Sequence, residues 1–389
     1  MANMLPKFLA KLDVEVHVLT LALPPYYQIN DFEESYKGFI NTNEMIPNKI
    51  EEIDGYYLHT MPYKRTLGYM RMEGLNKKIK ELKPDVVYSL ACIGWIALQA
   101  AFAKLKYGFK LYTGSHTTAS VFPLSTQKKL ILKPQMWKCL ITRALPGWLV
   151  SLVTEKCYGA TSDCAEIAVR FFGVQKSKID ICPLGVDTDT FRPICNEKDK
   201  KRRQQLRSQF GFNNEDVVCI YTGRFSNEKN PLVLAKAITK LQEKGKPFKG
   251  LFFGNGVQKK EIELQNGCIV QSFVPVHELG DYFRASDIGV WPTQESTSML
   301  DAAACGLPIL VNDTLVAIER VQGNGLQYSL NDVEDLVEKL IMLSKPAYRN
   351  QLGSNGAKKM KDKFSWMSMA VRRLNDFNEA IAKGGSNAK

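Results

Sequence analysis

The fold is decided by residues 216–230, which read DVVCIYTGRFSNEKN. The first half is an apolar run that ends at Gly223, and such a run is typical of a buried strand in a parallel sheet. A polar loop with two cations, Arg224 and Lys229, follows directly, and a helix is expected from Pro231. Ligands of open α/β sheets bind at the carboxyl ends of the strands, so we expect this loop to face a binding cleft.

Arg224 and Lys229 suit an anionic ligand. Arginine presents a planar fork of donors, whereas lysine presents a point charge. Together they could neutralise a diphosphate without a metal ion. The alternative is that both are solvated surface cations beside a strand end.

Apolar runs and amphipathic stretches alternate on both sides of this segment. A helix is expected over residues 75–82. The expected strands are residues 14–20, 85–90, 109–114, 216–223, 251–254, 268–270, 288–291 and 308–311. This alternation predicts the α/β class, with parallel sheets covered by helices.

The same rhythm restarts after residue 190, and 389 residues suffice for two cores. We predict two Rossmann-like domains facing a cleft. The N-terminal domain covers residues 1–188 and is joined by a C-terminal helix over 366–384. The C-terminal domain covers residues 189–365.

The amino end is unusual for a Rossmann-like domain, which should open with a strand, a glycine-rich turn and a helix. Here residues 5–12 look like that helix, so the first strand and its loop are missing. Either the gene model starts late, or the domain is shortened and has an unusual edge.

The composition limits the classes of partner that the protein is expected to bind. A net charge of +12 fits an anionic membrane surface, a polyanionic substrate or nucleic acid. Nucleic acid ranks last, because no zinc-finger spacing, RNP-like strand or long basic arm is present. Nine widely spaced cysteines and four dispersed histidines predict reduced core thiols in a cytoplasmic protein and no structural metal site. No apolar run reaches eighteen residues, so we predict no membrane-spanning helix.

A second motif lies at residues 291–308, WPTQESTSMLDAAACGLP, where a strand, a polar turn and a short helix are expected. The hydroxyl and backbone N–H groups of Ser296, Thr297 and Ser298 would favour an anionic or hydroxylated ligand at the start of that helix. The alternative is a capping box, with Ser298 as N-cap and Asp301 three residues later.

Two weaker signals accompany these motifs. Gly254 and Gly256 follow a strand and could let the backbone approach a ligand, although a plain turn explains them equally well. A full G-x-G-x-x-G is missing, which argues against a nicotinamide dehydrogenase. His116 follows the strand at 109–114 and could orient the acceptor or the sugar; a structural histidine is the alternative.

In this order the segments resemble the GT-B retaining glycosyltransferases, in particular family four. Residues 183–193, PLGVDTDTFRP, are similar to the family's "PNGVDTDRFRP", and residues 223–229 to its "GRLVPEKG" loop. Residues 300–308, LDAAACGLP, resemble "LEAMACGLP". Glu319 together with residues 323–326 resembles the glycine-containing segment at the end of the family's donor domain.

The resemblance implies roles for these residues. Arg224 and Lys229 would hold the donor diphosphate as it leaves, Asp301 would bind the ribose hydroxyls, and Glu295 would touch the donor sugar. The remaining candidates for donor binding are Gly223, Gly254, Gly256, Phe273, Ser296, Thr297, Ser298 and Met299. The sequence departs from the family pattern in two respects: five residues separate Glu295 from Asp301 instead of seven, and aspartate is one methylene shorter than glutamate.

The resemblance further implies transfer of a sugar from a nucleoside diphosphate sugar to a hydroxyl acceptor with retention, without a cofactor. The acceptor would be a glycan or a lipid-linked glycan of a surface polysaccharide. Residues 128–153 mix cations with tryptophan and leucine, which predicts contact with the inner face of an anionic membrane or, alternatively, a packed helix. A non-catalytic sugar-nucleotide-binding protein and a GT-B epimerase or phosphorylase are the rival functions. Base, sugar and acceptor stay open.

Overall fold

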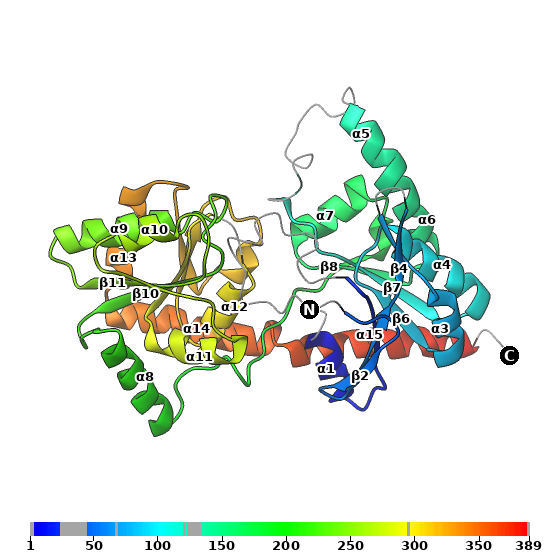
Figure 1. The fold of residues 1–389 in the computed structure, drawn as a ribbon, viewed down its shortest axis with the longest axis horizontal. Coiled ribbons are helices and arrows are strands. Elements are labelled where there is room, and N and C mark those ends of the chain that lie inside the picture. The colour runs from blue at the N-terminus through cyan, green and yellow to red at the C-terminus, as the bar shows by residue number, and fades with distance from the viewer. Residues whose placement is uncertain are drawn as a thin grey trace. The chain divides into compact units, whose positions relative to one another are not determined.

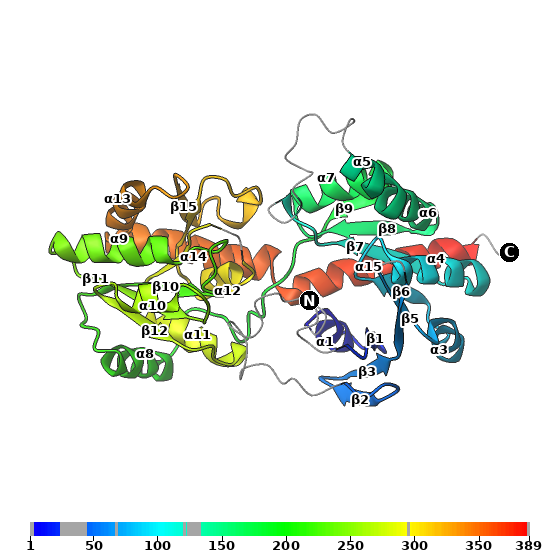
Figure 2. The same cartoon turned by 45° about the horizontal axis from the view of Figure 1, so that its top comes forward.

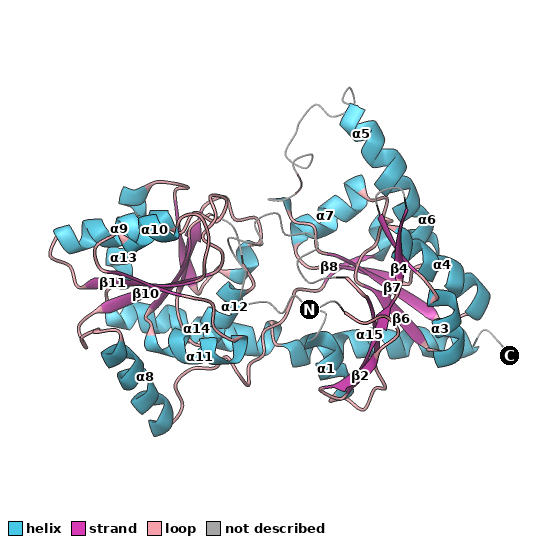
Figure 3. Ribbon diagram, in the orientation of Figure 1, coloured by secondary structure: helices cyan, strands magenta, loops and turns pink. Residues whose placement is uncertain are grey.

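The computed structural model describes residues 4–23, 45–66, 69–119, 122, 134–293 and 296–386. Among these residues the chain divides into two compact units, with boundaries after Leu184 and after Ser365. Unit 1 contains the amino-terminal half and the last helix, and unit 2 contains residues 185–365. Figure 1 labels the elements, and Figure 3 shows that both units contain helices and strands.

Unit 2 is built on one fully parallel sheet with the strand order β12-β11-β10-β13-β14-β15. The strands are β10 (Val217–Thr222), β11 (Phe248–Phe253), β12 (Cys268–Gln271), β13 (Ile288–Trp291), β14 (Ile309–Asn312) and β15 (Gly325–Tyr328). All six residues of β10 are buried, as expected for an apolar strand in the middle of a sheet that is covered on both faces.

The helices of unit 2 cover this sheet in pairs. Helix α9 packs on α13, α8 on α11, and α12 on α14. The helices are α8 (Glu197–Gln209), α9 (Leu232–Glu243), α10 (Lys259–Glu263), α11 (Val276–Ala285), α12 (Ser298–Ala304), α13 (Val333–Leu343) and α14 (Pro346–Lys363), with a 3₁₀ turn at Ile318–Arg320.

Helix α8 is almost entirely polar and is attached by buried ion pairs. Arg203 and Arg207 donate to the two carboxylate oxygens of Asp287, at 2.8 and 3.1 Å. The same carboxylate accepts from the backbone N–H of Val218 at 2.8 Å. This network ties α8 to the starts of β10 and β13, and so fixes two adjacent strands of the sheet.

In unit 1 the strands that the structure describes form three sheets, β1-β3-β2, β4-β5 and β6-β7-β8-β9. The strands are β1 (His17–Leu21), β2 (Ile50–Ile53), β3 (Tyr56–Met61), β4 (Tyr63–Thr66), β5 (Tyr69–Met72), β6 (Val86–Ser89), β7 (Lys110–Ser115), β8 (Lys156–Gly159) and β9 (Ile179–Ile181). The helices are α1 (Met4–Ala10), α3 (Leu75–Leu82), α4 (Trp95–Tyr107), α5 (Pro134–Cys139), α6 (Leu145–Val153), α7 (Ser162–Phe171) and α15 (Trp366–Ser386), with a π-helical segment at Leu140–Ala144 and a 3₁₀ turn at Lys176–Lys178. Figure 2 shows α15 running along this unit.

The structure confirms the α/β class, the parallel sheets and each strand expected from the sequence, with shifts of a few residues at the ends. It adds two antiparallel hairpins, β2–β3 and β4–β5, that were not predicted. The first turns at Asp54 and Gly55, whose φ angles are 50° and 83°. An Asp-Gly pair between apolar runs is a strong hairpin signal, so the sequence did contain the information for β2–β3.

Candidate active site

The loops that carry the predicted donor-binding residues emerge at one edge of the unit 2 sheet. All neighbouring strands in this sheet are parallel, so their carboxyl ends lie on the same side. The chain adds β11 and β12 on one side of β10, and then β13, β14 and β15 on the other. The strand order therefore reverses between β10 and β13, and such a switch point is where open α/β sheets bind ligands.

The loops after β10 and β11 pack backbone against backbone. Phe225 N–H donates to the carbonyl of Asn255 at 2.8 Å, and Gly223 N–H donates to that of Phe253 at 3.0 Å. A Cβ atom on Gly254 would lie 1.9 Å from the carbonyl oxygen of Gly223. Gly254 and Gly256 are thus needed for contact between the two loops. This contact explains both glycines without the close approach of a ligand to the backbone, and without the plain turn, that the sequence suggested.

The loop after β10 holds both predicted cations in a defined conformation. Tyr221 Oη donates to the carbonyl of Arg224 at 2.8 Å. The carbonyl of Ser226 accepts from the N–H groups of Lys229 and Asn230, at 3.2 and 2.8 Å. Arg224 and Lys229 are both half-buried.

Two hydroxyl groups beside these cations were missed by the sequence analysis. Thr222 Oγ1 and Ser226 Oγ are buried and have no hydrogen-bond partner among the described residues. Buried hydroxyls normally have partners, so unsatisfied ones at a strand end are candidates for ligand contacts. The signal that could have identified them is their position: Thr222 directly precedes Gly223, and Ser226 lies two residues after Arg224.

The loop after β13 is held by side chains of the two neighbouring strands β14 and β15. Asn312 Nδ2 donates to the carbonyls of Pro292 and Thr293, at 3.0 and 2.7 Å. Tyr328 Oη donates to the carbonyl of Pro292 at 2.9 Å. Trp291 Nε1 donates to the carbonyl of Thr222 at 3.2 Å, which joins this loop to the end of β10. Glu295, the predicted contact to the donor sugar, lies outside the described residues.

The capping-box interpretation of residues 296–301 is wrong. Helix α12 has Thr297 as its N-cap, without a side-chain cap, and Ser298 is already helical. Ser298 Oγ instead lies 2.9 Å from Ser296 Oγ and 3.5 Å from the carbonyl of Thr222. The sulfur of Met299 accepts from Ser296 N–H at 3.3 Å. The serines therefore order the turn against β10, which leaves the exposed Thr297 at its tip.

Asp301 is the most perturbed acid of this edge. Burial, together with the nearby charge of Asp187, raises the pKa of Asp301 from 3.8 to about 8. Asp187 accepts from the N–H and hydroxyl groups of Thr190, at 3.5 and 3.3 Å. Asp301 is thus protonated at neutral pH, and it becomes able both to donate and to accept a hydrogen bond.

Phe273 and His116 occupy different parts of the molecule. Phe273 is half-buried and follows β12, at the outer end of the same carboxyl edge. His116 follows β7 in unit 1. Burial and the charge of Arg373 lower the pKa of His116 from 6.5 to about 4, which keeps its imidazole neutral.

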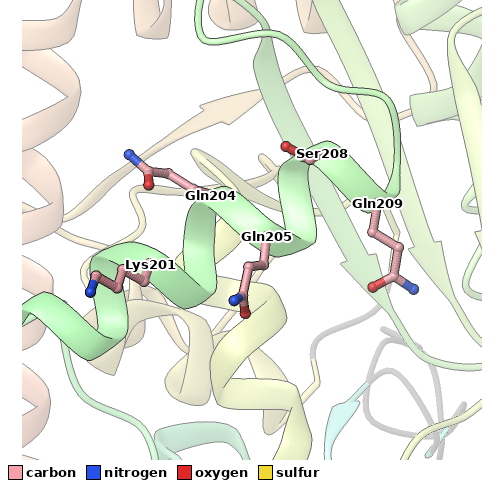
Figure 4. Close-up of a pocket in the computed structure, with 5 residues that line it drawn as sticks. All are labelled: Lys201, Gln204, Gln205, Ser208 and Gln209. Atoms are coloured by element: carbon pink, nitrogen blue, oxygen red, sulfur yellow. The ribbon is translucent and has the colours of Figure 1, made fainter.

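A shallow hollow along α8 contains none of these residues. It is lined by Lys201, Gln204, Gln205, Ser208 and Gln209, all from one face of the helix (Figure 4). In the described part of the chain, no group of three His, Cys, Asp or Glu side chains could hold a metal ion. No described helix is long and apolar enough to cross a membrane.

Comparison with known proteins identifies the family of the chain. The family model described as "Glycosyltransferase Family 4" matches residues 3–190, and "Glycosyl transferases group 1" matches residues 202–359. A D-inositol 3-phosphate glycosyltransferase from Xylanimonas cellulosilytica is 27% identical over 306 residues, which are 74% of this chain and 71% of that protein.

Two solved structures share the fold. A glycosyltransferase from Rickettsia africae matches with a TM-score of 0.68 and 15% identity, covering 98% of this chain and 94% of its own. The Anabaena protein HepE, solved in complex with UDP and glucose, matches with a TM-score of 0.61 and 13% identity, covering 82% of this chain and 86% of its own.

Proposed function

Because this chain belongs to the GT-B glycosyltransferases, with a family 4 domain followed by a group 1 domain, we propose that it moves a sugar from a nucleoside diphosphate sugar to a hydroxyl acceptor with retention at the anomeric carbon. The observation that carries this proposal is the position of Arg224 and Lys229. Both lie on the loop after β10, at the point where the strand order reverses.

In the proposed reaction the bond between the anomeric carbon and the diphosphate oxygen breaks, and its electron pair leaves with the diphosphate. Arg224 and Lys229 stabilise the charge that develops there. The acceptor hydroxyl attacks from the face that the diphosphate leaves, and its proton passes to the departing oxygen. Electrostatic stabilisation of a leaving group in a partly dehydrated site accounts for a large share of such rate enhancements.

The same loops supply the proposed contacts to the rest of the donor. Asp301 binds the ribose hydroxyls. Its carboxyl group releases its proton on donor binding, because the ribose hydroxyls then donate hydrogen bonds to the carboxylate. Phe273, at the end of β12, lies where a nucleobase can stack. Because HepE was solved with UDP and glucose, a uridine donor is the first to test. We propose catalysis without a metal or cofactor, and EDTA should then leave turnover unchanged.

We also propose that the acceptor is a glycan or lipid-linked glycan of a surface polysaccharide, reached at the cytoplasmic face of a membrane. The support is a run of exposed apolar side chains on the helical segment 134–153: Trp137, Ile141, Leu145, Trp148, Leu149 and Leu152. Spacings of three and four residues place them on one side of the helix. Exposed apolar stripes of this kind insert into the lipid interface.

Two of the cations that the sequence places in this segment belong to the described residues. Lys138 is exposed, but Arg143 lies over the rings of Phe122 and Phe172, at 5.4 and 5.8 Å. The other cations of the segment, Lys128, Lys129 and Lys133, lie outside the described residues. We propose apolar burial as the main attraction, with Phe102 and Leu105 on the neighbouring helix α4 as further exposed groups.

The experiment is a donor screen that measures turnover and product stereochemistry together. Uridine and guanosine diphosphate sugars are supplied with lipid-linked and free hydroxyl acceptors, and the anomeric configuration of the product is read by NMR. A product with the donor's configuration is expected. An inverted product, or no transfer from any nucleoside diphosphate sugar, would contradict the proposal.

A further inference from the structure

The side chain of Gln258 joins the two loops that follow β10 and β11. Gln258 lies after β11, directly before helix α10, and it is buried. Its Nε2 atom donates to Asn230 Oδ1 at 3.0 Å and to Asn227 Oδ1 at 3.3 Å, and both asparagines lie on the loop after β10. These asparagines stand on either side of Lys229 in the sequence. Gln258 therefore holds the short segment that contains one of the two cations proposed to bind the diphosphate.

The same side chain also holds the start of helix α9. Gln258 Oε1 accepts from the backbone N–H of Leu232, the first helical residue, at 3.3 Å. The preceding residue, Pro231, provides no side-chain cap, so the oxygen of Gln258 takes the place of one. A backbone N–H only donates, which orients the amide: its oxygen faces Leu232 and its nitrogen faces the asparagines. Both N–H groups and the oxygen of the Gln258 side chain are thus used in this arrangement.

The backbone next to Lys229 has a conformation that needs support. Asn230 has a φ angle of 44°, in the left-handed region that asparagine tolerates better than most residues but still at a cost. Its N–H and that of Lys229 donate to the carbonyl of Ser226, at 2.8 and 3.2 Å. This turn determines where the backbone places Lys229. The hydrogen bond from Gln258 to Asn230 fixes the residue whose φ angle defines the turn.

We propose that Gln258 is a positioning residue for sugar transfer, which holds Lys229 in the place where it stabilises the departing diphosphate. This inference rests on the proposed function and deepens it, because it makes the preorganisation of the cation, and not only its charge, part of the rate enhancement. A preorganised charge stabilises a developing charge without the cost of reorientation. Without the bridge the loop leaves the left-handed turn, and Lys229 then contacts the diphosphate in only a fraction of the molecules. The rival explanation is that Gln258 caps α9 and stabilises the fold without any effect on Lys229.

A double-mutant cycle between Gln258 and Lys229 separates these two explanations. Gln258→Met keeps the length of the side chain and removes its hydrogen bonds. We expect this variant to lower kcat/KM about tenfold in the wild-type background and less than about twofold in a Lys229→Ala background, because an absent lysine cannot be misplaced. The dissociation constants of UDP and GDP, measured by calorimetry, should show the same dependence on Lys229.

Gln265→Met is the matched control. Gln265 Oε1 accepts from Thr239 Oγ1 at 3.1 Å, so this variant also removes a side-chain hydrogen bond of a glutamine in unit 2. Gln265 precedes β12 and therefore lies at the amino edge of the parallel sheet, away from the loops at the carboxyl edge. Its substitution should leave kcat/KM and nucleotide affinity unchanged.

Hydrogen exchange gives a readout that does not depend on activity. The amides of residues 226–232 should exchange about tenfold faster or more in Gln258→Met, while the strands of unit 2 keep their protection. Asn230→Gly is the second variant, in case Gln258→Met does not fold. Glycine adopts a positive φ angle without strain, so the main loss is the side-chain bond to Gln258. We expect Asn230→Gly to lower kcat/KM about threefold or more, and again only when Lys229 is present.

The outcomes separate this inference from the proposed function. Equal losses with and without Lys229 would overturn the positioning role and leave the proposed function intact. Faster exchange of residues 226–232 with unchanged kcat/KM and unchanged nucleotide affinity would do the same. A wild-type protein that binds neither UDP nor GDP and transfers no sugar would contradict the proposed function, and the positioning role with it.

Discussion

Asp301→Asn should stabilise the protein at neutral and alkaline pH while weakening donor binding. The pKa of Asp301 is raised from 3.8 to about 8 in the folded chain by burial and by Asp187. Between these two values the folded state holds a proton that the unfolded state has released. Stability contributed by Asp301 therefore falls as pH rises from about 4 to 8, and is constant outside that window.

The magnitude follows from the span of the shift. One pKa unit corresponds to about 1.4 kcal/mol, so the upper limit at pH 8 is between about 5 and 6 kcal/mol. Asp301 retains part of its surface, and solvent screening should reduce the cost to about 3 kcal/mol. Asparagine cannot ionise and avoids this cost. For a unit of this size we expect the melting temperature of the variant to exceed that of the wild type by about 8 °C at pH 8, and to match it below pH 4.

The assay is thermal unfolding of both proteins from pH 4 to pH 9, with Asp362→Asn, an exposed aspartate in the same unit, as the control. Calorimetric titration with a nucleoside diphosphate at pH 7 gives the functional counterpart. The wild type should release about one proton on binding, and Asp301→Asn should release none and bind more weakly. A difference in melting temperature that does not vary with pH would refute the reasoning.

Three further predictions address the other proposed roles. Arg224→Ala or Lys229→Ala should lower kcat at least a hundredfold with an unchanged melting temperature, because losing one donor to developing charge costs about 2.7–4 kcal/mol. The control is Lys259→Ala, which removes an exposed cation beside Glu263. Turnover near the wild-type rate in Arg224→Ala or Lys229→Ala would exclude the diphosphate role. Trp148→Ser combined with Leu152→Ser should reduce sedimentation with anionic vesicles at least tenfold at both low and high salt. The control is Leu264→Ser, which alters a highly exposed leucine of unit 2 and should not reduce sedimentation. If high salt alone abolishes binding of the wild type, the attraction is due to charge. His116→Gln should leave the shape of the pH profile of kcat/KM unchanged between pH 5.5 and 7.5, because the pKa of His116 lies at about 4; an inflection near pH 6.5 that the variant loses would show that His116 titrates there.

The sequence was sufficient to predict the class of fold and the loops at the carboxyl edge, because these depend on local patterns. The apolar run that ends at Gly223 specified β10, and the motif around Asp301 specified α12. The contacts that organise the edge are not local. Asn312 and Tyr328 reach the loop after β13 from positions 20 and 36 residues away, and no periodicity indicates such pairings.

The errors have physical reasons as well. Ser298 fits the capping-box pattern, but its hydroxyl contacts the hydroxyl of Ser296 and the carbonyl of Thr222 at the end of β10. Only the order of strands in the sheet brings Thr222 close to Ser298. The acidity of Asp301 likewise depends on burial and on Asp187, which is remote in the sequence.

A crystal structure of the full chain with a bound nucleoside diphosphate sugar tests the central claim most directly. The account predicts that the diphosphate lies at the carboxyl ends of β10 and β13, with its oxygens within about 3 Å of the side-chain nitrogens of Arg224 and Lys229 and the ribose hydroxyls on Asp301. A donor bound elsewhere, or a diphosphate that contacts neither cation, would contradict it.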